Sequence, residues 1–331
     1  MSLKKIAEMT GVSPSTVSRV LNRTSPSCAS KELQDKIFDA ARKIGYQPNE
    51  NARMLRKHTV QKETTHHVSI VLARIRDIKH DPFFYELFRC LESELFQSRV
   101  SIDQVIYADD EPESDIAKSQ GVIILGRCSK KLLSHILAQT KNAIGIWRNS
   151  MDYQLDEVVC DGRKAAELAM DYLLSLGHKN IAYIGDCSHE SRYIGYCNSL
   201  IHNNIPMNYE WIKQTDQTRE SAGRAFYELL ESTQDFSAVF CANDITAVEI
   251  LKILKEKKRD IKRAISVISI DNIEESENTS PFLTTINIPR KEMAHMAVSL
   301  LLDRIAKKHT ETVRIEFPCR IVNRSSCYPN Q

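Results

Sequence analysis

The apolar positions of residues 1–48 recur at helical spacing and predict three short helices. Gly11 separates the first helix from the second, and glycine suits a tight turn because it adopts left-handed backbone angles freely. The third helix is expected to start near Ser30 and to end at Gly45. Helices joined by a short glycine turn are typical of a helix-turn-helix unit. The side chains expected to face inward are Leu3, Ile6, Ala7, Val17, Val20, Leu21, Leu33, Ile37, Ala40, Ala41 and Ile44.

The second predicted helix has little apolar surface and exposes a polar face. Ser13 is placed to cap this helix through its hydroxyl, and Pro14 fits the first helical position, where no backbone N–H is needed. The residues left facing outward are Ser15, Thr16, Ser18 and Arg19.

From residue 68 onward, short apolar runs alternate with longer helical patterns. VSIVLA, GVIILG and AIGIW belong to a first series, and NIAYIGD, SAVFCAND and ISVISIDN belong to a second series that begins with the helix AAELAMDYLLSLG. Strand patterns that alternate with helical patterns favour parallel sheets flanked by helices. The sequence therefore predicts two consecutive α/β units.

Composition indicates a globular cytoplasmic protein. The chain has 331 residues, 42% of them hydrophobic, which is enough to build more than one core. No apolar run approaches the roughly 18 residues that a membrane helix needs, and MSLKKIAEMT lacks the apolar stretch of a secretory signal. The nine cysteines are an odd number without a CxxC pair, so we expect reduced, mostly buried thiols.

Positive charge is concentrated at the start of the chain. Residues 1–66 contain 12 Lys and Arg against 6 Asp and Glu, although the whole chain has a net charge of only +2. A basic segment beside a neutral or acidic body suits contact with phosphates, although a solvated basic face is an alternative explanation.

The runs LKKIAEMTGVSPSTVSRVLN and GYQPNENARMLR resemble the DNA-binding head and hinge of the lac repressor family of bacterial transcription regulators. The resemblance continues through GHKNIAYIG, SRYIGY, FCAND, ISVISIDN and LTTINIP, which stand in the family's order. It implies an all-α helix-turn-helix head with a hinge helix, followed by an α/β body of two periplasmic-binding-protein-like, Rossmann-like subdomains with parallel sheets. The implied domains are the head at 1–48, the hinge helix and linker at 49–66, the N-proximal subdomain at 67–158 plus 288–313, and the C-proximal subdomain at 159–287 plus 314–331.

By this resemblance the second helix is the recognition helix in the major groove. Arg19 is expected to bind the O6/N7 edge of a guanine, whereas Ser13 and Ser18 are expected at phosphates, which carry no sequence information. Pro14 departs from the family, many of whose members read a base with a larger side chain at this position. The DNA-binding residues expected on this basis are Ser13, Pro14, Ser15, Thr16, Ser18, Arg19, Asn22, Tyr46, Asn49, Arg53 and Leu55.

Residues 49–57 can form a short basic helix that Asn49 caps. Its Leu55 has no evident core to enter, and so short a helix is marginal alone in water. In the family the matching hinge helix orders on DNA and its leucine wedges into the minor groove. The alternative is a linker in which Leu55 touches the neighbouring domain.

Ligands of open parallel sheets bind beyond the carboxyl ends of the strands. The resemblance implies that Arg192, Asn243 and Asp271 face an effector cleft there, where their donors and acceptors would suit the vicinal hydroxyls of a sugar. The alternative is structural, with Asn243 and Asp271 capping the helices that follow them and Arg192 on the surface. For Asp244 we favour the structural role.

Three aromatic residues are further candidates for the effector pocket. Trp147 ends the run AIGIW, where relatives often carry an aspartate, and Phe83 and Tyr85 open the helix after the first strand. Flat rings suit the C–H face of a pyranose and equally a nucleobase. We favour a carbohydrate effector and keep a purine or nucleoside as the alternative.

The sequence contains no GxSxG, Walker, GxGxxG or HExxH motif, so we expect no enzyme, no catalytic residue, no metal and no cofactor. The expected partners are double-stranded operator DNA, a small-molecule effector and a second copy of the chain in a homodimer, without a membrane. A sugar-binding or sugar-processing protein with no role on DNA is a remote alternative.

Overall fold

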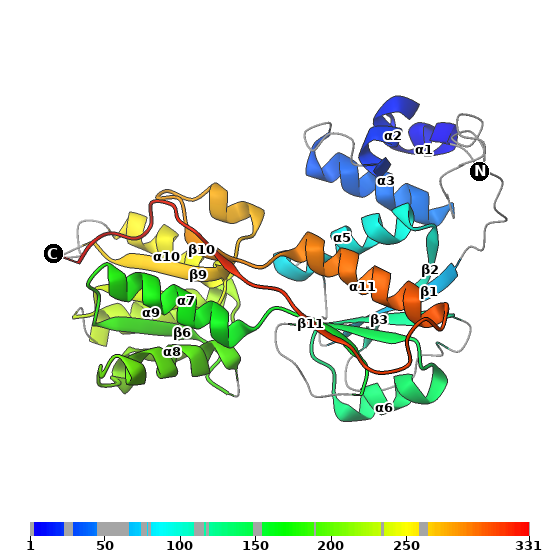
Figure 1. Cartoon of the computed structure of the whole chain (residues 1–331). Helices are drawn as coiled ribbons and strands as arrows, with labels where there is room; N and C mark the ends of the chain where they lie inside the picture. Colours follow the sequence, from blue (N-terminus) through cyan, green and yellow to red (C-terminus); the bar gives the residue numbers. More distant parts are fainter. Residues whose placement is uncertain are drawn as a thin grey trace. The chain divides into compact units, whose positions relative to one another are not determined.

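The computed structural model describes residues 3–22, 29–44, 66–73, 78, 81–108, 116, 119–147, 154–188, 190–232, 235–257 and 264–330. By its internal contacts the chain divides into two compact units (Figure 1). Unit 1 comprises Met1–Trp147, Tyr153–Val158 and Arg290–Arg314, and unit 2 comprises Arg148–Asp152, Val159–Pro289 and Ile315–Gln331.

The N-terminal part of unit 1 is a small helical domain, which we call the head. It consists of α1 (Leu3–Thr10), α2 (Pro14–Asn22) and α3 (Lys31–Lys43). Gly11 lies between α1 and α2 with a φ of +69°, the left-handed conformation that a glycine turn provides. Ser30 caps α3, because its hydroxyl accepts a hydrogen bond from the backbone N–H of Leu33 at 3.4 Å.

The core of the head confirms the predicted helical pattern. Ile6, Val17, Leu21 and Ile37 are completely buried. Phe38, which the periodicity did not single out, is also buried in this core. The prediction of a helix-turn-helix head is therefore confirmed, while the hinge helix predicted for residues 49–57 lies outside the described residues.

The rest of unit 1 is built on a six-stranded sheet with the order β11-β5-β4-β3-β1-β2. The strands β1, β2, β3 and β4 pair in parallel. Figure 1 shows α5 and α11 over one face of this sheet and α6 on the other. The elements are β1 (His66–Ala73), α5 (Pro82–Gln97), β2 (Val100–Ala108), β3 (Gly121–Leu125), α6 (Lys130–Gln139), β4 (Ala143–Trp147), β5 (Asp156–Val159), α11 (Arg290–Ile305) and β11 (Arg314–Glu316).

Unit 2 contains a second six-stranded sheet with the order β12-β10-β9-β8-β6-β7. The pairings from β7 to β10 are parallel, and β12 joins β10 antiparallel. α7 packs against α8, and α9 packs against α10. The elements are α7 (Gly162–Ser175), β6 (Ile181–Gly185), α8 (Ser191–His202), η2 (Tyr209–Trp211), β7 (Ile212–Gln214), α9 (Arg219–Ser232), β8 (Ala238–Cys241), α10 (Asp244–Glu256), β9 (Ser266–Asp271), η3 (Glu274–Glu277), β10 (Thr284–Asn287) and β12 (Arg320–Val322).

The strands in the middle of both sheets are covered on both faces. Every residue of β3, β4, β6, β8 and β9 is buried, which explains why these strands appear in the sequence as continuous apolar runs rather than as alternating patterns. The predicted α/β body with two mainly parallel sheets is confirmed. Among the described residues, no helix has the length and apolar character that crossing a membrane requires.

A buried carboxylate joins the elements at the carboxyl end of the unit 2 sheet. Asp244, the first residue of α10, accepts hydrogen bonds from the hydroxyls of Ser269 at 2.5 Å and Thr285 at 2.6 Å, and from the backbone N–H of Ile273 at 2.8 Å. Burial and the negative charge of Asp271 raise the pKa of Asp244 to about 7, although the three hydrogen bonds oppose them. Asp244 thus has a structural role, as expected from the sequence: it holds β9, β10 and the segment after β9 together.

This raised pKa gives stability a defined pH dependence. Between pH 3.8 and about 7 the folded chain binds a proton at Asp244 that the unfolded chain lacks, so the free energy of unfolding falls as the pH rises through this window. The contribution of this one group is on the order of 4 kcal/mol. In Asp244→Asn we expect the fall between pH 5 and pH 8 to be smaller than in the wild type, as measured by urea unfolding followed by tryptophan emission. The exposed substitution Glu228→Gln is the control and should keep the wild-type slope; equal slopes in wild type and Asp244→Asn would contradict the assignment.

Candidate nucleic-acid interface and effector site

The start of α2 presents a cluster of hydroxyls. The Ser13 hydroxyl accepts a hydrogen bond from the backbone N–H of Thr16 at 3.2 Å, which confirms the predicted cap. Its Oγ also lies 2.8 Å from the hydroxyl of Ser15 and 2.9 Å from that of Thr16. Pro14 occupies the first helical position, and Val17 behind this surface is completely buried.

The polar face of α2 is open to solvent. Ser13, Pro14, Ser15 and Arg19 are exposed, and Thr16 and Ser18 are half-buried. Because Val17, Val20 and Leu21 anchor the helix to α1 and α3, the opposite face is available to a partner. The DNA-reading roles of these residues stay predictions.

Several predicted DNA contacts fall where the structure gives no description. Tyr46, Asn49, Arg53 and Leu55 lie outside the described residues, and α2 ends at Asn22, whose side chain is not described.

The predicted effector residues of unit 2 meet around a buried arginine. Arg192, in the first turn of α8, is only 4% exposed. Its Nη1 donates a hydrogen bond to the carbonyl of Ala242 at 2.6 Å, its Nη2 to Oε1 of Gln217 at 2.9 Å, and its Nε to Oε1 of Glu190 at 2.9 Å. The guanidinium therefore joins α8 to the end of β8 and to the loop after β7. It is not the surface arginine of the structural alternative.

Asn243 follows β8, and Asp271 ends the neighbouring strand β9. Asn243 caps α10 by accepting from the backbone N–H of Thr246 at 3.0 Å, and its amide donates to the carbonyl of Gln217 at 3.4 Å. Asp271, at the end of β9, has a φ of +133° and is 3% exposed. Burial lowers the pKa of Arg192, but the carboxylates of Glu190 and Asp271 outweigh it and raise that pKa above its ordinary value.

Gln217 is a residue of this cluster that the sequence analysis missed. It binds Arg192 through its side chain and Asn243 through its carbonyl, and its own φ is +64°. The rule applied to β6, β8 and β9, that residues following a parallel strand face the ligand, also applies to β7 and would have pointed to the segment TDQT.

The predicted aromatic residues of unit 1 do not share one environment. Phe83 is 3% exposed and packs edge-on against Phe84, with ring centroids 5.2 Å apart. Tyr85 lies against the head instead: the Lys31 ammonium is 5.7 Å from its ring centre, and burial together with a hydrogen bond to Asp35 raises its pKa. The structure thus separates Tyr85 from Phe83, and the effector roles of both residues stay predictions.

Trp147 is folded back over its own strand. It ends β4 and is 4% exposed. A Cβ at position 145 would lie 2.0 Å from an indole carbon, so Gly145 provides the space in which the ring lies. The place of Trp147 at the carboxyl end of a strand is consistent with an effector role, which stays a prediction.

In the part of the chain that the structure describes, no group of three or more His, Cys, Asp or Glu side chains could hold a metal ion.

Two family models match the chain. Residues 2–49 match bacterial regulatory proteins of the lacI family, and residues 170–327 match a periplasmic binding protein-like domain. The HTH-type transcriptional repressor PurR of Photorhabdus laumondii is 28% identical over 342 residues, covering 98% of this chain and 96% of that protein.

Two solved structures share the fold. The transcriptional regulator CelR in complex with cellobiose has a TM-score of 0.71 at 23% identity, over 99% of this chain and 100% of that chain. A LacI family transcriptional regulator from Enterococcus faecium with bound ribose has a TM-score of 0.70 at 27% identity, over 80% of this chain and 100% of that chain. The two family-model matches agree with the helix-turn-helix head and the two parallel sheets: the chain joins a helix-turn-helix domain of the lacI family of bacterial regulatory proteins to a periplasmic-binding-protein-like domain.

Proposed function

We propose that this lacI-family repressor acts as a homodimer that binds a near-palindromic operator and changes its affinity for that operator when a small sugar binds. The main support for the proposal is the exposed polar face of α2. The opposite, apolar face of this helix is buried in the core of the head, and the head matches the lacI family. Two such heads would place two recognition helices at two half-sites, as the symmetry of a dimer requires.

Arg19 is the proposed base-reading residue of the recognition helix. Its side chain is exposed, and a guanidinium can donate two parallel hydrogen bonds to a guanine edge. Ser13 is occupied with capping the helix and Pro14 has no N–H to donate, so specificity rests on Ser15, Thr16 and Arg19. Ser18 and Asn22 would contact phosphates, which fix the register of the protein on the duplex.

The hinge is proposed to bind the minor groove between the half-sites. Tyr46 and Asn49, at the start of the hinge, would contact the DNA backbone. Arg53 would add a phosphate contact, and Leu55 would wedge between base pairs. Insertion of an apolar wedge unstacks a base step and bends the duplex.

The effector is proposed to bind at the carboxyl end of the unit 2 sheet. Beyond its hydrogen bonds to protein, the Arg192 guanidinium has further N–H groups, and Asp271 provides a carboxylate acceptor beside it. This pairing of donors and acceptor suits the vicinal hydroxyls of a sugar, and the cellobiose and ribose in the two similar structures support this class. A purine or nucleoside is the second candidate.

The sugar would act by a population shift. A ligand changes operator affinity only to the extent that it binds one conformation of the repressor more tightly than the other. The decisive experiment measures binding of the protein to DNA fragments from around its own gene, without ligand and with ribose, galactose, cellobiose, adenine and guanosine. The ligand that shifts the binding curve identifies the effector class, and the direction of the shift distinguishes an inducer from a corepressor.

Arg19→Ala should weaken binding to the operator about 10- to 100-fold, because a bidentate contact to guanine is worth roughly 1 to 3 kcal/mol. Binding to random duplex DNA should change much less. Lys57→Ala is the control, since loss of a phosphate contact weakens both kinds of binding and flattens their salt dependence. Fluorescence anisotropy at several salt concentrations measures the affinities of the wild type and of both variants for operator and for random DNA. An equal loss of affinity for operator and random DNA in Arg19→Ala would rule out base reading by Arg19.

Asp271→Asn should leave operator affinity unchanged and raise the sugar concentration for half-maximal response about tenfold or more. Asparagine keeps the shape of the side chain and tolerates a positive φ, but it removes the charged acceptor. Operator anisotropy during a sugar titration gives the half-maximal concentration. The matched control is Asp171→Asn, which removes an exposed carboxylate on α7 and should respond to sugar as the wild type does. A wild-type response in Asp271→Asn would exclude Asp271 from the effector site.

A further inference from the structure

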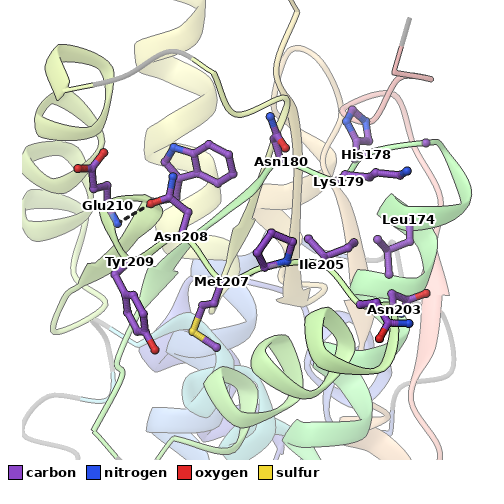
Figure 2. Close-up of a pocket in the computed structure, with 14 residues that line it drawn as sticks. Leu174, His178, Lys179, Asn180, Asn203, Ile205, Met207, Asn208, Tyr209 and Glu210 are labelled. Atoms are coloured by element: carbon purple, nitrogen blue, oxygen red, sulfur yellow. Dashed lines mark hydrogen bonds between the residues drawn. The ribbon is translucent and has the colours of Figure 1, made fainter.

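Unit 2 contains a hollow at the end of its sheet opposite to Arg192. The hollow has a volume of about 780 Å³ (Figure 2), within the usual range of small-molecule sites. It lies where α7 ends, before the start of β6, and under the loop that leads from α8 to β7. The residues that line it are 174, 177–180 and 203–211.

This hollow is separate from the candidate effector site. β6 begins at Ile181, next to the hollow, and ends at Gly185, beyond which lie the groups around Arg192. Five strand residues span about 16 Å, so two ligands could bind unit 2 at the same time. The hollow thus lies at the amino ends of the strands, where the rule for parallel sheets predicts no site.

Trp211 lines the hollow, while its indole N–H is buried. Among the residues that the structure describes, Nε1 of Trp211 is buried and has no hydrogen-bond acceptor. Leaving such a donor unpaired in a protein interior costs free energy, and most buried donors are paired. Because almost none of the surface of this nitrogen is accessible, a ligand in the hollow would contact other atoms of Trp211 rather than its N–H.

Two asparagines of the lining, Asn180 and Asn208, each have one amide atom bound to protein and the other available. Asn180 donates through Nδ2 to the carbonyl of Asp235 at 3.1 Å, which leaves its Oδ1 as an acceptor. Asn208 accepts from the backbone N–H of Glu210 at 3.0 Å, drawn as a dashed line in Figure 2, which leaves its Nδ2 as a donor. His178, in contrast, uses both ring nitrogens, on the Ser237 hydroxyl and the Tyr328 carbonyl. It is part of the wall rather than a ligand-binding group.

The charges of the lining do not favour an ionic ligand. The lining includes one lysine, Lys179, and one carboxylate, Glu210, and both are exposed. The lining also includes the apolar side chains of Ile205 and Met207, and in Figure 2 both lie below Asn180 and Lys179. Apolar contacts combined with separate donors and acceptors match a ring that has C–H faces and hydroxyls around its edge.

We propose that this hollow is a second ligand site, which binds a neutral saccharide of one or two rings independently of the candidate effector site. The sugar places a C–H face against the apolar side chains of Ile205 and Met207, accepts a hydrogen bond from Asn208 Nδ2 and donates a hydroxyl to Asn180 Oδ1.

The chain contains only two tryptophans, Trp147 and Trp211, so each single substitution leaves one reporter. In Trp147→Phe all indole emission comes from Trp211 beside the hollow. We expect titration of the full-length variant with glucose, galactose, ribose and cellobiose to change this emission saturably for at least one sugar. No saturable change with any of the four at millimolar concentrations would overturn the proposal, and saturation by adenine alone would overturn the ligand class.

Asn208→Asp in the Trp147→Phe background tests the hydrogen-bonding role. Aspartate keeps the acceptor that caps η2 but loses the Nδ2 donor, so the affinity for the sugar should fall about fivefold or more. Asn278→Asp, on an exposed loop elsewhere in unit 2, is the matched control and should bind as the parent does. Unchanged affinity in Asn208→Asp would contradict the proposed contact.

Asp271→Asn in the same background separates the two sites. The Trp211 response should keep its midpoint even where the operator response to sugar is lost, and loss of both together would mean that Trp211 reports the effector site. If Trp147→Phe does not fold, calorimetry on the wild-type chain replaces emission. Wild type should then bind more sugar per chain than Trp211→Phe, and equal stoichiometry and affinity would overturn the proposal.

Discussion

The carboxyl end of the unit 2 sheet is organised by a guanidinium that is almost entirely removed from water. A buried charge is stable only when hydrogen bonds and opposite charges replace its hydration. Arg192 meets this condition through Glu190, the Ala242 carbonyl and Gln217, which belong to three different segments of unit 2. Those segments are therefore fixed relative to one another before any ligand arrives. Because the hydrogen bonds fix the guanidinium plane, its remaining N–H groups have a defined direction.

A buried carboxyl group adds to this arrangement. Asp244 gathers the hydroxyls of β9 and β10 and the backbone beyond β9, and in doing so it fixes the chain where Asp271 leaves the strand. Asp271 has opposite effects on its two neighbours: its charge stabilises the charged form of Arg192 and destabilises that of Asp244. A ligand that changes the charge or solvation of Asp271 therefore acts on both buried groups. This coupling gives a small ligand influence over several elements of unit 2.

The elements that the sequence predicted best are those whose burial follows a simple period. The stripe of Val17, Val20 and Leu21 and the continuous apolar runs of the central strands correspond directly to buried faces. Loop residues were harder to predict. Gln217 lies in a polar stretch in which nothing marks one residue over the next, and its role depends on a contact with a residue 25 positions away.

The aromatic candidates show a different limit. Phe83 and Tyr85 look like a pair in the sequence, but residues two positions apart on a helix point about 200° apart around its axis. Phe83 consequently packs into the body of unit 1, while Tyr85 meets Lys31 and Asp35 of α3. For Trp147, the orientation of the indole depends on the absence of a side chain at Gly145, a relation that helical or strand periodicity does not encode.

The helix α8 runs between the two ends of the unit 2 sheet. Its first turn carries Arg192, and its last turn borders the hollow lined by residues 203–211. Along its length it is held tightly: a Cβ at Gly195 would lie 2.5 Å from the carbonyl oxygen of Arg163, and the Tyr196 hydroxyl donates to the Ile181 carbonyl at 2.8 Å. A helix packed this closely moves as a body rather than bending, because its neighbours leave no space for local adjustment. A ligand in the hollow would therefore influence Arg192 by favouring one position of the whole of α8 over another. The resulting change in the binding free energy at the effector site could not exceed the difference between the ligand's binding free energies for the two positions of α8.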